Sequence, residues 1–302
     1  MILELRDINK SFGEKQVLCG VSFAAESGKA FGLLGRNGAG KTTSIRILMD
    51  VFPADSGEVL IDSKPIDYNK IGIGYLPEER GLYPKKTIID QLVYLAQLKG
   101  MDRKSATRSI DQWLERLGMT EYRNKRLDTL SKGNQQKIQL ITALAHDPDI
   151  VILDEPFSGF DPVNAQIIRE EILRLKEEGA TIILSTHNME SVEELCDNIA
   201  LINKSHLVIS GGVDEIRRKY GNNNVELIYT SSAAIKPVAG VFSVISDVDD
   251  SGRHTAVLSL ENQSDSNAAL KEIISQGVAV NSYKELVPRM NDIFIKLVTE
   301  EE

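Results

Sequence analysis

Apolar positions along the chain alternate between short runs and longer stretches with helical spacing. Short apolar stretches at residues 29–34, 150–153 and 181–184 predict strands. The unbroken run at 150–153 is typical of a strand that is buried on both faces of a parallel sheet. Apolar residues spaced three and four positions apart at residues 42–49 and 164–178 predict amphipathic helices. Strands that alternate with helices in this way predict an α/β sheet.

The middle of the chain departs from this alternation. Between about residues 81 and 145 the pattern is helical throughout, with stops at Gly100 and Gly118 and a third helix that begins at the capping residue Ser131. The sequence therefore predicts an α/β domain that is interrupted by an all-helical insertion. The remaining predicted elements of this domain are strands at 2–8, 17–23, 71–76, 200–202 and 207–209, and a helix at 189–196.

The clearest linker in the chain is the run Gly-Asn-Asn-Asn at residues 221–224. We therefore predict two domains, residues 1–220 with the helical insertion at about 81–145, and a small α/β domain over residues 221–302. The elements expected in the small domain are strands at 225–229, 241–245, 255–258 and 278–280, and helices at 264–275 and 288–298.

Charge and hydropathy limit the possible partners. The 302 residues include 35 Lys and Arg against 44 Asp and Glu, a net charge of −9. This acidic balance disfavours nucleic acid as a partner, because such binding depends on cationic side chains that displace counterions. The sequence shows no signal peptide and no run of about 18 apolar residues. We therefore expect a cytoplasmic protein, and any membrane-spanning part of its complex would be another chain.

Residues 35–42, with the sequence GRNGAGKT, match a phosphate-binding loop placed between a predicted strand and a predicted helix. Small residues let successive backbone N–H groups converge on phosphate oxygens, and the helix N-terminus adds the positive end of its dipole. Lys41 would reach the terminal phosphates and the Thr42 hydroxyl would bind Mg²⁺. The nucleotide-binding residues predicted here are Gly35, Asn37, Gly38, Gly40, Lys41, Thr42 and Thr43.

Two carboxylates follow the buried run at residues 150–153. Asp154 and Glu155 stand at the carboxyl end of that strand, where open α/β sheets bind their ligands. Asp154 is suited to hold magnesium, as the corresponding aspartate does in other phosphate-loop enzymes. Glu155 points elsewhere and could polarise an attacking water as a general base. The loop and the two acids together predict an enzyme that hydrolyses a nucleoside triphosphate with Mg²⁺.

The run LSKGNQQ at residues 130–136 resembles the LSGGQ signature of the ABC transporter ATPases. Ser131 and Gly133 match the signature, whereas Lys132 and Asn134 replace a glycine and the glutamine. The resemblance covers about residues 2–219 and implies a phosphate-loop ATPase fold with a helical subdomain. It also implies that Ser131 and Gly133 contact the γ-phosphate of ATP held by a second subunit, so that the active form is a dimer, most simply a homodimer.

Further residues fall in the order expected of this family. Glu78 stands where the family usually has a glutamine, and a carboxylate there could also bind Mg²⁺ or position water. Asp161 lies in the run SGFD, which resembles a loop that crosses the dimer interface. His187 resembles the histidine that senses the γ-phosphate. Phe12 stands where the family places an aromatic ring against adenine.

Within the family, three features resemble the ATPases of sodium-efflux and ABC-2-type export systems. They are the run GYLPEERGLY at residues 74–83, the signature variant, and the extension over 221–302. The resemblance implies an integral membrane permease as partner and a location at the inner face of the membrane. Two other classes stay open. One is a soluble ATPase of the same family that acts on DNA repair or ribosomes, and the other is a regulatory ATPase module.

Overall fold

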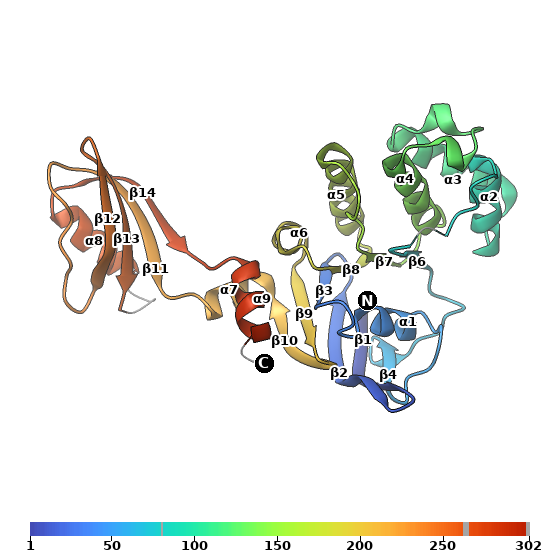
Figure 1. The fold of residues 1–302 in the computed structure, drawn as a ribbon, viewed down its shortest axis with the longest axis horizontal. Coiled ribbons are helices and arrows are strands. Elements are labelled where there is room, and N and C mark those ends of the chain that lie inside the picture. The colour runs from blue at the N-terminus through green and yellow to red at the C-terminus, as the bar shows by residue number, and fades with distance from the viewer. Residues whose placement is uncertain (80, 262–265, 300–302) are drawn as a thin grey trace. The chain divides into compact units, whose positions relative to one another are not determined.

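The computed structural model describes residues 1–79, 81–261 and 266–299. They form two compact units, the first being Met1–Val213 and the second starting at Asp214; Figure 1 labels their elements. The division lies seven residues before the predicted boundary at 220/221. The reason is a helix that the sequence analysis missed, α7 (Val213–Lys219). Its Arg217 Nε donates to the carbonyl oxygen of Pro288 at 3.0 Å, which ties α7 to the second unit.

A six-stranded sheet in the order β10-β9-β3-β8-β7-β6 forms the centre of the first unit. Five of its strands run parallel and β10 pairs antiparallel with β9. Every residue of β3, β7 and β8 is buried, as the apolar runs in the sequence predict. The predicted α/β class is therefore confirmed. The strands are β3 (Ala30–Leu34), β6 (Ile73–Leu76), β7 (Ile150–Asp154), β8 (Thr181–Thr186), β9 (Asn198–Asn203) and β10 (His206–Gly212).

A second sheet in this unit is antiparallel, in the order β2-β1-β4-β5. Its strands are β1 (Ile2–Phe12), β2 (Lys15–Glu26), β4 (Ser56–Ile61) and β5 (Lys64–Pro65). Strands β1 and β2 correspond to those predicted at 2–8 and 17–23, but both continue beyond the predicted ends. Strands β4 and β5 were not predicted, because five of their eight residues are exposed and so show no apolar periodicity.

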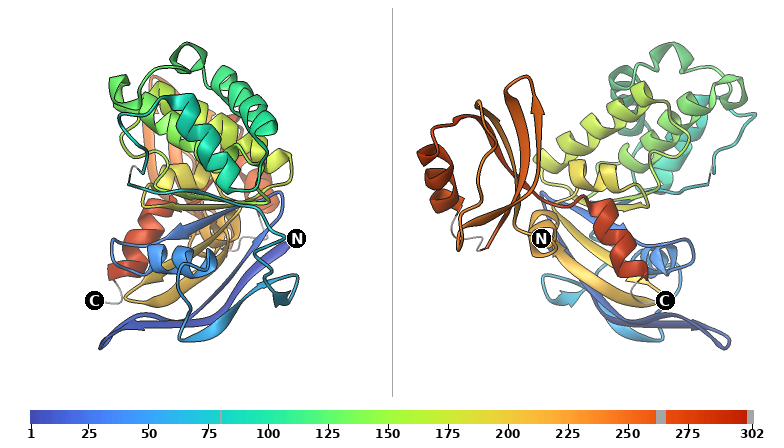
Figure 2. Two further views of the ribbon diagram at one scale, coloured as in Figure 1. Left: turned by 90° about the vertical axis from the view of Figure 1, so that its right-hand side faces the viewer. Right: turned by 60° about the vertical axis from the view of Figure 1, so that its left-hand side comes forward.

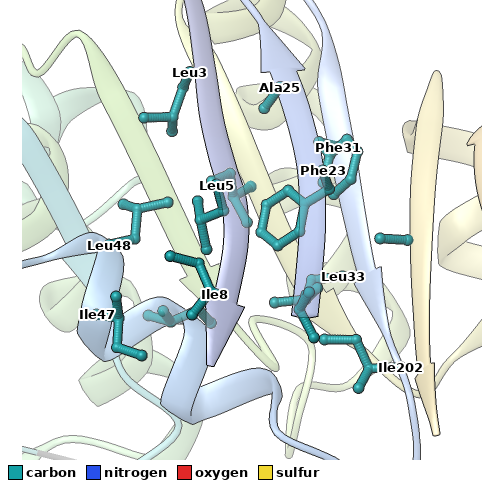
Figure 3. Packing of buried hydrophobic residues seen from close by; sticks show 14 of the residues in the cluster. Leu3, Leu5, Ile8, Phe23, Ala25, Phe31, Leu33, Ile47, Leu48 and Ile202 are labelled. Atoms are coloured by element: carbon teal, nitrogen blue, oxygen red, sulfur yellow. The ribbon is translucent and has the colours of Figure 1, made fainter. Parts of the chain in front are cut away.

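The core of the first unit lies between the two sheets. Leu5 and Phe23 of the antiparallel sheet pack towards Phe31 and Leu33 of β3 (Figure 3). The rings of Phe23 and Phe31 stack with centroids 5.0 Å apart. Helix α1 (Lys41–Leu48) adds Leu48 to the same cluster. The strand that leads into the glycine loop and the helix that follows it are thus fixed by one apolar core.

The predicted helical insertion is present as α2 (Ile88–Leu98), α3 (Arg103–Arg116) and α4 (Lys132–Leu144), with short 3₁₀ turns at Thr120–Tyr122 and Leu127–Thr129. Figure 2 shows the three helices packed together. Each begins at a side chain that accepts a hydrogen bond from the first turn, Thr87, Asp102 and Ser131 respectively. After the insertion the chain continues through α5 (Pro162–Glu177) and α6 (Met189–Leu195).

The second unit contains a four-stranded antiparallel sheet in the order β12-β13-β11-β14. Alternate residues of β11 and β13 are buried in an apolar cluster that includes Ala269 and Ile273 of α8. The elements are β11 (Asn224–Thr230), β12 (Phe242–Asp250), β13 (Arg253–Leu260), α8 (Ser266–Ser275), β14 (Ala279–Leu286) and α9 (Met290–Thr299). All six are predicted elements. The first two positions of the helix expected at 264–275 lie outside the described residues.

Candidate functional site

The loop between β3 and α1 needs glycine for steric reasons. Gly35 and Gly40 have φ angles of +152° and +121°, which L side chains rarely adopt. A Cβ atom on Gly35 would lie 2.3 Å from the carbonyl oxygen of Ile202, and one on Gly40 would lie 2.6 Å from Leu18 Cδ2. The loop therefore packs directly on its neighbouring strands, which holds its backbone N–H groups in place.

Lys41 begins α1 and only 7% of it is exposed. Its Nζ donates to the carbonyl oxygen of Gly35 at 2.6 Å and to that of Arg36 at 3.3 Å, so the ammonium group lies beneath the loop. Burial lowers the pKa of Lys41, while the charges of Glu155, Asp154 and Glu78 act against this shift. One cation and three carboxylates therefore share a small region.

Asp154 ends β7 with 4% of its surface exposed. Burial raises the pKa of this carboxyl, and the neighbouring charge of Glu155 adds to the effect, whereas Lys41 opposes it. Tyr75 Oη donates a long hydrogen bond of 3.5 Å to Asp154 Oδ2. Burial, with a contribution from Asp154, raises the pKa of Tyr75 to about 12, so its hydroxyl keeps its proton and can donate.

Glu155 turns out of the sheet with a φ of +49° while its N–H still donates to the carbonyl oxygen of Ser185 at 2.8 Å. Its Oε2 accepts from Thr186 Oγ1 at 3.3 Å, and its Oε1 lies 2.6 Å from His187 Nδ1. The parallel register, with Asp154 opposite Ser185, explains this meeting of residues some 30 positions apart. The glutamate carboxylate is thus oriented by two partners from the end of the next strand.

These residues surround a cavity of about 430 Å³, a size typical of small-molecule sites. Glu78, Asp154 and Glu155 line it together with the glycine loop. The remaining predicted residues that line it are Phe12, Asn37, Gly38, Gly40, Lys41, Thr42 and Thr43. Lys15, Val17 and Arg36 also line the cavity, and the sequence analysis missed all three. Lys15 and Val17 come from β2 of the other sheet and carry no motif, while Arg36 occupies a position that the loop motif leaves unspecified.

Phe12 lies at the rim of this cavity with 52% of its surface exposed. Its ring meets Phe52 edge to face, with centroids 5.5 Å apart and an interplanar angle of 86°. Lys10 Nζ lies 5.6 Å from the centroid of the same ring. The ring is therefore held in position while much of it remains open to a stacking partner.

Five predicted site residues do not line this cavity: Gly35, Ser131, Gly133, Asp161 and His187. Ser131 caps α4 and accepts from the N–H of Asn134 at 3.3 Å. Asp161 caps α5 and accepts from the N–H of Asn164 at 2.9 Å. A Cβ atom on Gly133 would lie 3.2 Å from the side-chain nitrogen of Asn164, so the signature and the loop before α5 are neighbours. His187 contacts the cavity residue Glu155, so Ser131, Gly133 and Asp161 are the predicted site residues that form a second group, apart from the cavity.

A glycine loop with a buried lysine, facing two carboxylates at the end of a parallel strand, defines the phosphate-loop class of nucleotide-hydrolysing proteins. The comparisons with known proteins identify the family. Residues 18–158 match the family model "ABC transporter", and residues 211–298 match "ATP-binding protein DrrA1-3-like, C-terminal domain". The chain belongs to the ATP-binding proteins of ABC transporters, which are ATPases.

Individual relatives agree with this assignment. The chain is 46% identical to the uncharacterized ABC transporter ATP-binding protein YhaQ of Bacillus subtilis, over 75% of this chain and 76% of YhaQ. It is 29% identical to a Nod factor export ATP-binding protein I of Burkholderia lata, over 80% of this chain and 81% of that protein. A solved ATP-binding subunit of an ABC transporter matches with a TM-score of 0.67 and 28% identity, over 73% of this chain and 93% of that one.

Within residues 1–79, 81–261 and 266–299, no helix combines the length and the apolar character that crossing a bilayer requires.

Proposed function

We propose that this chain drives an exporter by closing on a second copy of itself when both bind ATP. One observation carries the proposal. Most residues expected to bind ATP line one cavity, whereas Ser131 and Gly133, which are also expected to contact ATP, lie outside that cavity in the same chain. A second subunit can supply the missing side of the cavity. Export rather than import is favoured by the match to the DrrA-like domain and by the relative that is named for Nod factor export.

The residues beneath the loop fit magnesium. Thr42, Glu78 and Asp154 offer hydroxyl and carboxylate oxygens, the hard ligands that Mg²⁺ prefers. Among the described residues no group of three or more His, Cys, Asp or Glu side chains could hold a metal by itself. This agrees with the usual Mg²⁺ site of nucleotide enzymes, where one or two protein ligands act together with phosphates and water. Bound there, Mg²⁺ would neutralise phosphate charge.

The remaining roles follow from the geometry around the cavity. Glu155, oriented by Thr186 and His187, would accept a proton from the attacking water. Lys41 would balance the negative charge of the terminal phosphates from beneath the loop. The partly exposed ring of Phe12 would stack on the adenine base. Asp161, close to the signature of its own chain, would stand at the dimer interface.

The dimer can be tested by cross-linking Asn37→Cys in the glycine loop to Ser131→Cys of the second copy. We expect a disulfide-linked dimer when ATP is present and little without it. The native Cys19 and Cys196 are replaced by serine, and the background carries Glu155→Gln to preserve ATP. Non-reducing electrophoresis measures the product, and each single cysteine variant is the control. Equal cross-linking with and without ATP would argue against ATP-driven closure.

A groove of about 500 Å³ is suited to receive the permease. Residues 68–73 and Tyr75 line one part of it, and Met49, Leu98, Lys99 and His146 complete it. Leu98 is 65% exposed, and Tyr94 one turn earlier on α2 is 54% exposed. Leu98 at the groove and Tyr94 outside its lining leave two large apolar side chains exposed one turn apart on α2. Because exposed apolar surface marks binding sites, we propose that a permease segment binds here, with the chain at the inner face of the membrane.

Replacing Leu98 by aspartate tests this contact. We expect co-purification with the permease from membranes to fall at least tenfold, because a charge would be buried in an apolar contact. The ATPase activity of the isolated subunit should stay within twofold of the original, because Leu98 is largely exposed and outside the nucleotide cavity. Leu173→Asp on α5, also at an exposed apolar position, is the matched control. Unchanged membrane association of Leu98→Asp would contradict the placement.

A further inference from the structure

Gln139 on α4 makes a contact that no motif explains. The side chain is buried, with 4% of the residue exposed, and its Nε2 donates to the carbonyl oxygens of Pro77 at 3.2 Å and of Glu79 at 3.0 Å. These carbonyls flank Glu78. A carboxamide has two N–H donors on one nitrogen, and here both are used to hold the segment that carries Glu78.

The segment that carries Glu78 depends on hydrogen-bond donors from elsewhere in the chain. An ionised carboxylate accepts hydrogen bonds but donates none, so Glu78 cannot fasten its own loop by donating to nearby carbonyl groups. Glu78 also lines the 430 Å³ nucleotide cavity beside Asp154 and Glu155. A small displacement of the Pro77–Glu79 segment would therefore change the position of the Glu78 carboxyl group relative to those of Asp154 and Glu155.

Helix α4 connects this loop to the signature. Ser131 caps the helix, and Gln139 follows eight residues later, about 12 Å along the axis at the rise of an α-helix. One turn before Gln139, Gln136 Nε2 donates to the carbonyl oxygen of Ser158, in the loop that follows Glu155. Two glutamines on one face of α4 thus hold the two loops next to the catalytic end of β7.

We propose that Gln139 is a positioning residue that couples the signature helix to Glu78. When α4 moves as Ser131 engages the second subunit's ATP, the amide of Gln139 carries the Glu78 segment with it. Glu78 then reaches its working position beside the metal and the attacking water only in the closed dimer. This inference rests on the proposed function, since it assumes that α4 meets ATP across the dimer.

The test is a set of kinetic variants of the full-length protein. In Gln139→Leu, which removes both donors at similar volume, we expect kcat to fall about tenfold, within the range seen for residues that orient metal ligands. The Kd for ATP should change less than twofold. The Mg²⁺ concentration for half-maximal activity should rise several-fold. Gln139→Met, unbranched and without a donor, repeats the test if the leucine variant folds poorly.

A second measurement separates positioning from a general structural role. In a Glu78→Ala background, Gln139→Leu should lower kcat by less than a further twofold, because residues that act as a unit are not additive. Gln135 is the matched control, since its Nε2 also donates to two carbonyls, those of Leu127 and Leu130 within the helical insertion. Gln135→Leu should lower kcat by the same factor with and without Glu78.

Two outcomes would overturn the inference. One is an unchanged kcat in both Gln139 variants. The other is a tenfold loss that persists undiminished in the Glu78→Ala background, which would show that Gln139 acts elsewhere. Neither outcome touches the proposed function, which fails separately if Glu155→Gln hydrolyses ATP at the original rate or if no ATP-dependent dimer forms.

Discussion

Replacing Glu155 by glutamine is expected to lower ATP turnover about 1,000-fold while the affinity for ATP stays within a few-fold. The amide keeps the size of the side chain but cannot take a proton from water, and general base catalysis is typically worth 10²–10⁴ in rate. Lys41 and the glycine loop, which would hold the phosphates, are unchanged. ATP should therefore remain bound, and the protein should accumulate as a dimer.

Two measurements check this expectation. Phosphate release gives turnover, and size-exclusion chromatography with light scattering gives the oligomeric state with and without ATP. Glu170→Gln, an exposed glutamate on α5, is the matched control and should behave as the unmodified protein. Turnover by Glu155→Gln within threefold of the original would remove Glu155 from its proposed role as base.

Gly35→Ala is expected to lower the free energy of unfolding of the first unit by about 3 kcal/mol, at the upper end for overpacking. The added Cβ would lie 2.3 Å from the carbonyl oxygen of Ile202 and 3.1 Å from the Cβ of Ala39, so β9 or the loop must move. Movement of the loop also displaces the carbonyl that accepts from Lys41. We therefore expect ATP affinity to fall at least 100-fold.

Gly38→Ala provides the comparison within the same loop. Its φ is +81°, and a Cβ there meets nothing within 4 Å, so only the backbone preference is lost, about 1 kcal/mol. Thermal unfolding without nucleotide measures both variants, and a fluorescent ATP analogue measures affinity for Gly35→Ala. Equal losses of stability in the two variants would show that close packing against Ile202 is not what requires glycine at position 35.

Much of the fold could be predicted because apolar runs and helical spacing are local properties. The strands at 29–34, 150–153 and 181–184 correspond to β3, β7 and β8, and the three helices of the insertion correspond to α2, α3 and α4. The exposed strands β4 and β5 could not be found, because they bury too little apolar surface to leave a pattern. The domain boundary was placed late because α7 is short and is held to the second unit by a side-chain contact.

The candidate site could be predicted where its functional residues are consecutive in the sequence. The glycine loop and the pair Asp154 and Glu155 are such runs, and ten of the predicted site residues line one cavity. Lys15 and Val17 were missed because they reach the cavity from a different sheet. Gln139 was missed because its importance depends on two carbonyl groups about 60 residues earlier in the chain.

By itself, the sequence determined the class of this protein and its nucleotide, and it predicted which side chains carry the chemistry. The glycine loop, the pair Asp154 and Glu155, and the signature each consist of residues that are neighbours in the chain, so they can be recognised from the sequence. Only the tertiary structure decided that Glu155 meets His187, that Lys41 lies beneath the glycine loop, and that Ser131 stands outside the nucleotide cavity. Lys41 is only six residues from Gly35, but its place beneath the loop depends on the folded path of the loop backbone. The other two relations are set by strand register and by the packing of α4. They join residues more than 20 positions apart and leave no local pattern.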